Sequence, residues 1–170
     1  MSGSVALIGF MGAGKTRIGR LVARELGVSF VDTDDVIVRT HGPIAELFAT
    51  RGEPAFRELE RAVVLSELDA AQRETRVVAL GGGAVTIDAV REVLRRLPHV
   101  VWLDAPPHIL YRRAQSGTRP LATSEALFEA LYADRLPFYR DAATVVVRTT
   151  GRERAAWVAD QVIAAAREER

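Results

Sequence analysis

The segment Gly9-Phe10-Met11-Gly12-Ala13-Gly14-Lys15-Thr16 is a complete G-x-x-x-x-G-K-T phosphate-binding loop, and it constrains the fold more strongly than any other feature. The glycines let successive backbone N–H groups turn toward an anion, the lysine reaches the β- and γ-phosphates, and the threonine can ligate Mg²⁺. The chain has 22 Arg but one Lys, the lysine of this motif. A compact ammonium lies beside a phosphate more easily than a planar guanidinium. We therefore predict a nucleoside triphosphate site at Gly12, Ala13, Gly14, Lys15 and Thr16.

The motif lies between a short apolar run and a stretch with helical periodicity, which is the pattern of a strand, a loop and a helix. An apolar stripe at helical spacing runs from Ile18 to Leu26 and stops at Gly27. Apolar runs separated by helical patterns occur at residues 5–8, 29–32, 76–80, 99–104 and 144–148. This alternation predicts an α/β fold with five parallel strands, and the nearly continuous apolar runs indicate helices on both faces of the sheet.

Composition limits the broad class of protein. With 170 residues, 48% hydrophobic content and no Pro/Gly/Ser-rich linker, the chain is expected to form a single domain over residues 1–170. A formal net charge of +1 gives no general reason to expect nucleic-acid or membrane partners. The absence of cysteine excludes disulfides and thiolate catalysis and fits a reducing compartment. The first apolar run is too short for a signal or membrane span, so we expect a cytoplasmic protein, and we further expect a monomer.

Acidic residues follow two of the predicted strands, at the edge where ligands of parallel sheets bind. If the chain stays extended after the second strand, Asp32 and Asp34 point the same way, so that one could hold Mg²⁺ and the other could accept a proton from a substrate hydroxyl. The alternative is that they only cap a helix that begins near Val36. Asp104 ends the fourth strand and competes for the metal, although the following Ala-Pro-Pro favours an ordinary turn.

Gly81, Gly82 and Gly83 follow the third strand. Three residues without Cβ permit positive φ and let a ligand lie against the backbone, although a turn required only by packing is the alternative. Arg57 lies in a helix that we expect to open at Gly52-Glu53-Pro54, with Pro54 in the first turn. Taken alone, Arg57 would be interpreted as a solvated surface arginine.

A basic segment over residues 112–124 interrupts the helical pattern and contains Arg112, Arg113 and Arg119. We interpret it as a mobile lid that excludes water and brings an arginine to a transferring phosphoryl group, with a plain solvated loop as the alternative. Farther on, Arg135-Leu136-Pro137-Phe138-Tyr139 places a proline within a helix or at its end, and simple helix termination is the alternative there. The three histidines lack metal-ligand spacing.

Taken in order, the motifs of this chain resemble those of the shikimate kinase family. They are the phosphate-binding loop, Asp32-Thr33-Asp34, Phe56-Arg57-x-x-Glu60, the triple glycine, Arg119-Pro120-Leu121 and Arg135-x-Pro-x-Tyr139. The resemblance implies a three-layer P-loop kinase fold with strand order 2-3-1-4-5, a substrate-binding segment at about 33–61 and a lid at about 112–124. It also implies transfer of the γ-phosphoryl group of ATP to the 3-hydroxyl of shikimate, with Mg²⁺, in aromatic amino acid biosynthesis.

The resemblance also implies a role for each matching residue. Lys15 and Thr16 would serve ATP and Mg²⁺, Asp32 would hold the metal through water, and Asp34 would contact the shikimate hydroxyls as the candidate base. Two guanidinium forks would bind the substrate carboxylate above a glycine wall, and an arginine would act from the lid. These residues are Arg57 and Arg135 for the carboxylate, Gly81, Gly82 and Gly83 for the wall, Arg119 for the lid, and Arg113 in preference to Arg112 for packing on adenine. Asp104 would have no part in the metal site.

The sequence disfavours two other classes of protein. Another small-molecule kinase of the same fold, such as a gluconate kinase, is disfavoured by the triple glycine and by Arg135-x-Pro-x-Tyr139. A GTPase-like switch would need the Asn-Lys-x-Asp motif that reads guanine, and therefore a second lysine, which the chain does not have.

Overall fold

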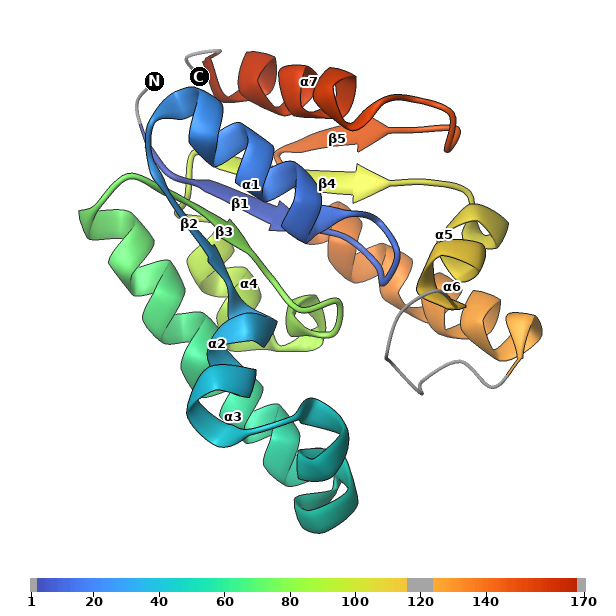
Figure 1. The fold of residues 1–170 in the computed structure, drawn as a ribbon. Coiled ribbons are helices and arrows are strands. Elements are labelled where there is room, and N and C mark those ends of the chain that lie inside the picture. Colours follow the sequence, from blue (N-terminus) through green and yellow to red (C-terminus); the bar gives the residue numbers. More distant parts are fainter. Residues whose placement is uncertain (1–2, 116–123, 168–170) are drawn as a thin grey trace.

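The computed structural model describes residues 3–115 and 124–167 and contains one parallel sheet of five strands (Figure 1). The strands are β1 (Val5–Ile8), β2 (Ser29–Asp32), β3 (Arg76–Ala79), β4 (His99–Asp104) and β5 (Val145–Arg148), in the order β2-β3-β1-β4-β5. The parallel α/β sheet and its 2-3-1-4-5 order are therefore confirmed. The apolar runs located each strand to within one residue at either end.

Helices cover both faces of the sheet, so the described part of the chain has three layers. The helical elements are α1 (Lys15–Leu26), α2 (Thr33–His41), α3 (Ile44–Arg73), the short 3₁₀ helix η1 (Ala84–Thr86), α4 (Asp88–Leu94), α5 (Pro107–Gln115), α6 (Glu125–Ala142) and α7 (Ala155–Arg167). Figure 1 shows α1 and α7 on one face of the sheet and α3, α4 and α6 on the other. No helix in residues 3–115 and 124–167 is long and apolar enough to span a membrane.

The side chains of the strands alternate between the two faces, which divides the core in two. In β1, Val5 and Leu7 pack with α1 and α7, whereas Ala6 and Ile8 pack with α3, α4 and α6. All four are at most 1% exposed. A strand that is buried on both faces has an almost continuous apolar sequence, as observed here.

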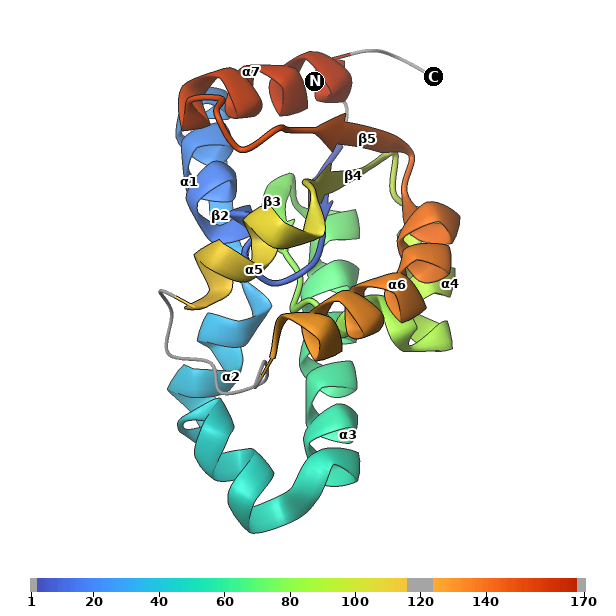
Figure 2. The ribbon, with the colours of Figure 1, turned by 90° about the vertical axis from the view of Figure 1, so that its right-hand side faces the viewer.

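The carboxyl ends of all five strands lie at one edge of the sheet, because the strands are parallel. Figure 2 looks onto this edge, with α5 in front of the strand ends. The phosphate-binding loop, the acidic residues after β2 and the triple glycine after β3 all leave the sheet here. The fold therefore brings together the motifs that the sequence presents separately.

The long helix α3 is broken at Gly52, whose φ of 77° and ψ of 168° are not helical. Pro54 lies in the first turn after this break, where its missing N–H is not required, as predicted. Phe56 follows and packs with Ile37 of α2 and Leu47 in a small cluster of its own. The break thus folds the first part of α3 back over α2 and directs the second part, with Arg57, toward the sheet edge.

The local geometry decides two points that the sequence left open. The chain does not stay extended after β2, because α2 begins at Thr33 and Asp34 lies in its first turn. Pro137 does not end a helix, because α6 continues through it to Ala142. A proline inside a helix removes the hydrogen bond to the carbonyl one turn earlier and crowds that carbonyl. Packing against η1 and the sheet holds α6 in spite of this.

Candidate active site

The phosphate-binding loop between β1 and α1 has the backbone conformation that its glycines allow. Gly12 and Gly14 have φ of 81° and 87°, values that other residues rarely adopt. A Cβ on Gly12 would lie 2.4 Å from the carbonyl oxygen of Leu110, so α5 also leaves no room for a side chain there. Lys15 Nζ donates to the carbonyl oxygens of Gly9 at 2.7 Å and Phe10 at 3.2 Å. The ammonium group is thus held over the loop.

Asp32 caps a helix, which the sequence left as the alternative to a metal site, and it also contacts the phosphate-binding loop. Its Oδ1 caps α2 by accepting a hydrogen bond from the Asp34 N–H at 3.0 Å, and its Oδ2 accepts one from Thr16 Oγ1 at 2.5 Å. Burial raises the pKa of Asp32, the hydrogen bond from Thr16 opposes this shift, and the nearby charges of Asp34 and Asp35 add to it. A cation in the cleft would therefore be stabilised beside Asp32 and Asp34, which both line it.

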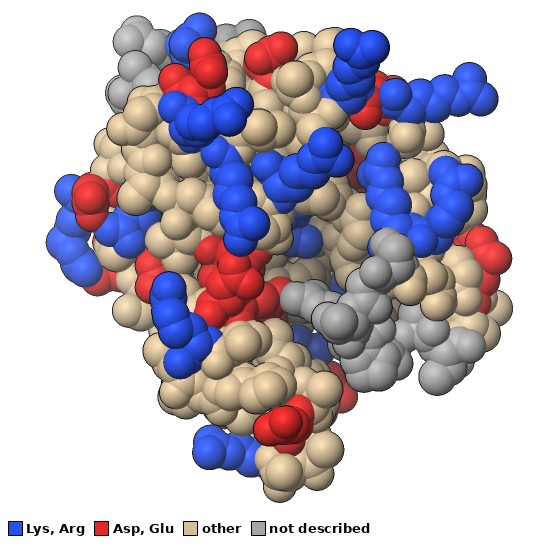
Figure 3. Space-filling model, in the orientation of Figure 1, with Lys and Arg blue, Asp and Glu red and all other residues tan. Residues whose placement is uncertain are grey.

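A cleft of about 590 Å³ lies over the loop. Figure 3 shows basic side chains around a hollow in this part of the surface, with a group of acidic side chains beside it. The cleft is lined by most of the residues predicted for ATP and Mg²⁺, namely Gly12, Ala13, Gly14, Lys15, Thr16, Asp32 and Arg113, and also by Asp34. The structure thus brings the predicted nucleotide and metal residues together in one cavity.

The far end of the cleft lies between α5 and the loop that joins β5 to α7. Arg113 lines the cleft, and its Nη2 donates to the Gly151 carbonyl at 3.4 Å. Glu153 closes the same loop by accepting hydrogen bonds from Thr150 and Gly151, and these bonds, chiefly from Thr150, lower its pKa to about 2. Arg112 does not line this cleft. Packing of Arg113 on adenine stays a prediction.

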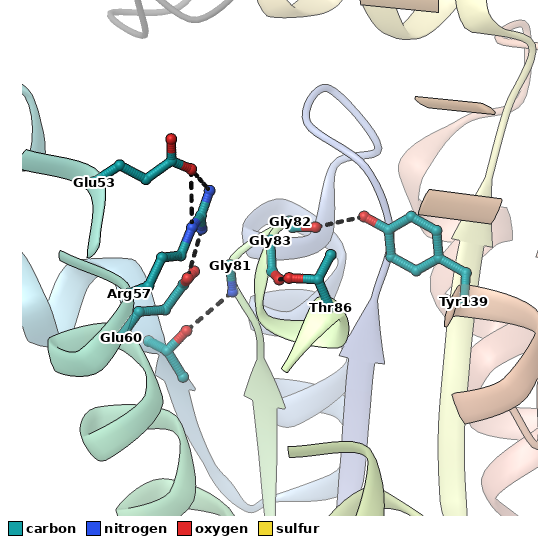
Figure 4. A network of polar contacts seen from close by, with 9 residues as sticks. Glu53, Arg57, Glu60, Gly81, Gly82, Gly83, Thr86 and Tyr139 are labelled. Carbon is teal, nitrogen blue, oxygen red and sulfur yellow. Dashed lines mark hydrogen bonds and ion pairs between the residues drawn. The ribbon is translucent and has the colours of Figure 1, made fainter. Parts of the chain in front are cut away.

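Arg57 is not a solvated surface arginine, because acidic residues hold both edges of its guanidinium (Figure 4). Nη1 donates to Glu60 Oε2 at 2.6 Å, while Nη2 and Nε donate to Glu53 Oε1 at 3.1 and 3.3 Å. The side chain of Glu60 is 3% exposed and that of Glu53 is 64% exposed. Burial raises the pKa of Glu60, Arg57 opposes this shift, and Asp34 adds to it.

None of the three glycines adopts a positive φ, and space is tight at Gly81 and Gly83. A Cβ on Gly81 would lie 2.7 Å from Asp34 Oδ1 and 2.8 Å from Glu60 Oε1, and one on Gly83 would lie 2.3 Å from Arg57 Nη1. Such distances are shorter than real Cβ contacts. The functional groups of α2 and α3 therefore occupy the positions that side chains would take in this turn.

Arg135 approaches from α6 and is 8% exposed. Its guanidinium lies 5.3 Å from the centroid of the Phe10 ring in the phosphate-binding loop. Burial lowers its pKa, Tyr139 and Glu60 oppose that shift, and the positive charge of Arg57 contributes to it. Arg57 and Arg135, the two residues predicted to bind a carboxylate, are therefore close enough to influence each other electrostatically.

Asp104 is occupied by contacts within the protein, although it also lines the cleft. Its Oδ1 accepts a hydrogen bond from the Tyr132 hydroxyl at 2.7 Å, and its Oδ2 lies 3.8 Å from Arg148 Nε. In residues 3–115 and 124–167, no group of three or more His, Cys, Asp or Glu is arranged to hold a metal ion. A site for Mg²⁺ here would use few carboxylates together with phosphate oxygens, as is usual for this ion.

Sequence reasoning assigned no separate role to three buried residues of the site: Thr33, Glu60 and Tyr139. The spacing of Arg57 and Glu60 could have indicated their contact, because residues three apart share a helix face. No local pattern could have paired Thr33 or Tyr139 with the glycine turn, which is 48 and 57 residues away respectively. Arg119 and residues 116–123 of the predicted lid lie outside the described residues.

Comparison with known proteins agrees with this geometry. The sequence profile described as shikimate kinase matches residues 11–167. The shikimate kinase of Symbiobacterium thermophilum is 44% identical over 156 residues, which cover 88% of each chain. The solved structure of the shikimate kinase from Acinetobacter baumannii in complex with shikimate has a TM-score of 0.87 and 34% identity, and the match covers 95% of this chain and 90% of that one.

A solved gluconokinase from Sinorhizobium meliloti has a TM-score of 0.64 and covers 96% of this chain and 90% of its own. Its identity of 20% shows the shared fold alone. The family profile spans nearly the whole of this chain, and three relatives matched at 41 to 44% identity are shikimate kinases. From its site, its fold and these matches, the chain belongs to the shikimate kinase family.

Proposed function

We propose that the protein transfers the γ-phosphoryl group of ATP to the 3-hydroxyl of shikimate, giving shikimate 3-phosphate and ADP. The observation that carries this proposal is that one glycine turn lies against both the phosphate-binding loop and Arg57, while Arg135 lies over Phe10 of that loop. A triphosphate and a small carboxylic acid can therefore bind side by side. That the protein is cytoplasmic and monomeric stays a prediction. Light scattering during size-exclusion chromatography gives the molar mass and so tests whether the protein is a monomer.

The nucleotide half of the site binds phosphates by charge and by backbone N–H groups. Lys15 would neutralise the β- and γ-phosphates as charge moves in the transition state. Thr16 would ligate Mg²⁺ and Asp32 would hold it through water, and the hydrogen bond between them at 2.5 Å places the two oxygens together. When bound, Mg²⁺ would offset charge on the phosphate oxygens. Arg119 would act on the same phosphoryl group from the lid.

Asp34 would orient the acceptor hydroxyl and accept its proton. It is the carboxylate that faces both halves of the site, since it lines the nucleotide cleft and its Oδ1 lies against Gly81. Burial of the neighbouring Glu60 raises the pKa of that carboxyl, and the charge of Asp34 raises it further. The two carboxylates are thus close, and Arg57 balances the charge between them.

The carboxylate of shikimate would bind Arg57 and Arg135. Glu60 holds one edge of the Arg57 guanidinium from a buried position, whereas Glu53 holds the other edge from an exposed one. Exposed ion pairs contribute little free energy, so a substrate carboxylate could replace Glu53 at small cost. Arg135 is already desolvated over Phe10 and would gain a charge partner.

Release of ADP with shikimate, with gluconate and with no acceptor tests the proposal directly. We expect ADP release that depends on shikimate and on Mg²⁺, with gluconate no better than the blank. Mass spectrometry of the product identifies the phosphorylated acceptor. Equal rates with gluconate, or a rate independent of acceptor, would show that the assignment of the substrate is wrong.

Replacement of the two substrate arginines should chiefly weaken shikimate binding. Because the carboxylate is charged in the ground state, Arg57→Ala should cost about 2 kcal/mol of binding free energy and Arg135→Ala about 3 kcal/mol, the larger value belonging to the more buried side chain. Steady-state kinetics with shikimate varied at saturating ATP measures both. Arg119→Ala is the contrasting variant, with an expected fall in kcat of about 10²–10³-fold. A kcat defect alone in Arg57→Ala would contradict the assignment.

Arg113→Ala should raise the KM for ATP about 5- to 10-fold, because it removes a cationic side chain from the nucleotide cleft. Arg112→Ala is the matched control, since this neighbour is also exposed but does not line that cleft. Isothermal titration with ADP gives the affinities without turnover. If Arg112→Ala weakened ADP binding as much as Arg113→Ala, the choice of Arg113 would be wrong.

A further inference from the structure

The backbone of the glycine turn is held by three hydroxyl groups (Figure 4). Thr33 Oγ1 accepts a hydrogen bond from the Gly81 N–H at 3.0 Å, the Tyr139 hydroxyl donates to the Gly82 carbonyl at 2.7 Å, and Thr86 Oγ1 donates to the Gly83 carbonyl at 2.8 Å. Thr86 is a near neighbour within the following 3₁₀ helix, but Thr33 and Tyr139 come from α2 and α6. Each of these two is 0% exposed.

Each glycine of the turn faces a different part of the site. The missing side chain of Gly81 leaves its place to Asp34 and Glu60, and that of Gly83 leaves its place to Arg57. A Cβ on Gly82 would lie 3.5 Å from the Met11 amide nitrogen and 3.6 Å from the Gly9 carbonyl oxygen in the phosphate-binding loop. The position of this turn therefore sets the spacing between the phosphate loop, the candidate base and the carboxylate-binding arginine.

The bond from Tyr139 also sets the direction of a backbone donor. The Gly82–Gly83 peptide is trans, so its C=O and N–H point in opposite directions. With the Gly82 carbonyl directed to Tyr139, the Gly83 N–H points away from it, toward the side of the turn on which Figure 4 shows Arg57. Among the described residues no hydrogen-bond acceptor pairs with the Gly82 or Gly83 N–H. A buried N–H group normally has a hydrogen-bond acceptor, so we expect these two to donate to oxygens of the substrate.

The position of the Tyr139 hydroxyl is itself fixed by the core. Its ring stacks on Trp102 of β4, with centroids 5.5 Å apart and an interplanar angle of 14°. Trp102 is 2% exposed, so neither ring can move far. Removal of the hydroxyl alone leaves this stacking in place. The hydrogen bond to Gly82 can therefore be tested separately from the packing of α6.

We propose that Tyr139 and Thr33 are positioning residues for the acceptor: their hydroxyl groups hold the glycine turn so that its free N–H groups and Arg57 meet the substrate in one orientation. The inference rests on the proposed function, because it takes the acceptor to be the carboxylic acid bound beside this turn. Tyr139 of the Arg135-x-Pro-x-Tyr139 motif and Thr33, between Asp32 and Asp34, thus each have a role of their own. Neither residue needs to contact the substrate.

Tyr139→Phe and Thr33→Val remove one hydroxyl each and nearly conserve volume. We expect each to raise the dissociation constant and the KM for shikimate about 5- to 10-fold, which corresponds to the free energy of one hydrogen bond. The KM for ATP should stay within about twofold of that of the parent protein. kcat should change less than the affinity for shikimate. Thr33→Ser keeps the acceptor oxygen and should restore shikimate affinity to within about twofold of the parent protein.

Ser4→Ala is the matched control for lost stability. Ser4 is 2% exposed, and its hydroxyl donates to the Ala71 carbonyl at 2.6 Å just before β1, at the opposite edge of the sheet from the site. Its replacement should lower the melting temperature as the other two variants do, with unchanged shikimate affinity. Titration calorimetry with shikimate, steady-state kinetics and thermal melts followed by circular dichroism give the three quantities.

The inference is overturned if Tyr139→Phe and Thr33→Val behave like Ser4→Ala, with lower melting temperatures and unchanged shikimate affinity. It is also overturned if both lose ATP and shikimate affinity equally, which would mean general loosening. If one variant fails to fold, the other, together with Thr33→Ser, decides the matter. A parent enzyme without shikimate-dependent ADP release would instead contradict the proposed function, so the two failures are distinguishable.

Discussion

Lys15→Ala is expected to lower kcat by about 10³–10⁵-fold, the range found for a charged group that acts on a transferring phosphoryl group. Lys15 is the only lysine of the chain, so no second ammonium can take its place. Its Nζ lies over the loop, on the carbonyl oxygens of Gly9 and Phe10, where the phosphates would bind. The side chain contributes little to the core, and the melting temperature should change by no more than a few degrees.

Arg24→Ala is the control for the loss of one positive charge from α1. Arg24 is an exposed basic residue in the last turn of the same helix, away from the cleft over the loop. Its replacement should leave kcat within about twofold. The coupled ADP-release assay compares the variants at saturating substrates, and turnover of Lys15→Ala within tenfold of the parent enzyme would contradict the role of the loop.

Asp34→Asn is expected to lower kcat by about 10²–10⁴-fold with ATP affinity nearly unchanged. The amide keeps the shape of the carboxylate but can no longer accept a proton. Because Asp34 Oδ1 lies at the glycine turn between the nucleotide cleft and the arginines, the loss should fall on the chemical step. Single-turnover measurements with preformed enzyme and ATP separate that step from binding.

The neighbouring Asp35 provides a matched control in sequence. Its side chain is 61% exposed, and its Oδ2 lies 3.3 Å from Arg20 Nη2 on α1, away from the glycine turn. Asp35→Asn should therefore retain kcat within about twofold. If Asp34→Asn lost ATP affinity but kept its turnover at saturating nucleotide, then Asp34 would belong to the nucleotide half and not to the acceptor.

Local sequence patterns predicted the helices and strands well, because burial and backbone preference act on neighbouring residues. Continuous apolar runs located the strands, since a central parallel strand is buried on both faces. Gly27 and Pro54 marked a helix end and a helix start, as their backbone preferences require. The strand order came from the ordered set of motifs and not from periodicity, because pairing between strands distant in sequence leaves no local signal.

The sequence predicted which residues form the site but not the contacts between them. The chain is not extended after β2, because Asp32 caps α2 and places Asp34 in the first turn of this helix. Glu60 is a charged residue whose burial depends on Arg57, and Tyr139 is a tyrosine whose hydroxyl depends on a turn in another part of the chain. Such partnerships arise from tertiary packing, which a pattern of residue types does not contain.

The lone lysine of the phosphate-binding loop has a practical consequence for chemical labelling. An amine-reactive reagent finds one side-chain target in this chain, Lys15, besides the terminal amine. Two carbonyl groups of the loop hold that target at the place where triphosphate would bind. Trypsin leaves the labelled lysine and the terminal amine in one peptide, residues 1–17, because the first arginine is Arg17. Fragment masses of this peptide separate the two labels, and the label on Lys15 then reports how much of the enzyme is protected by nucleotide, without mutation and without any assay of turnover.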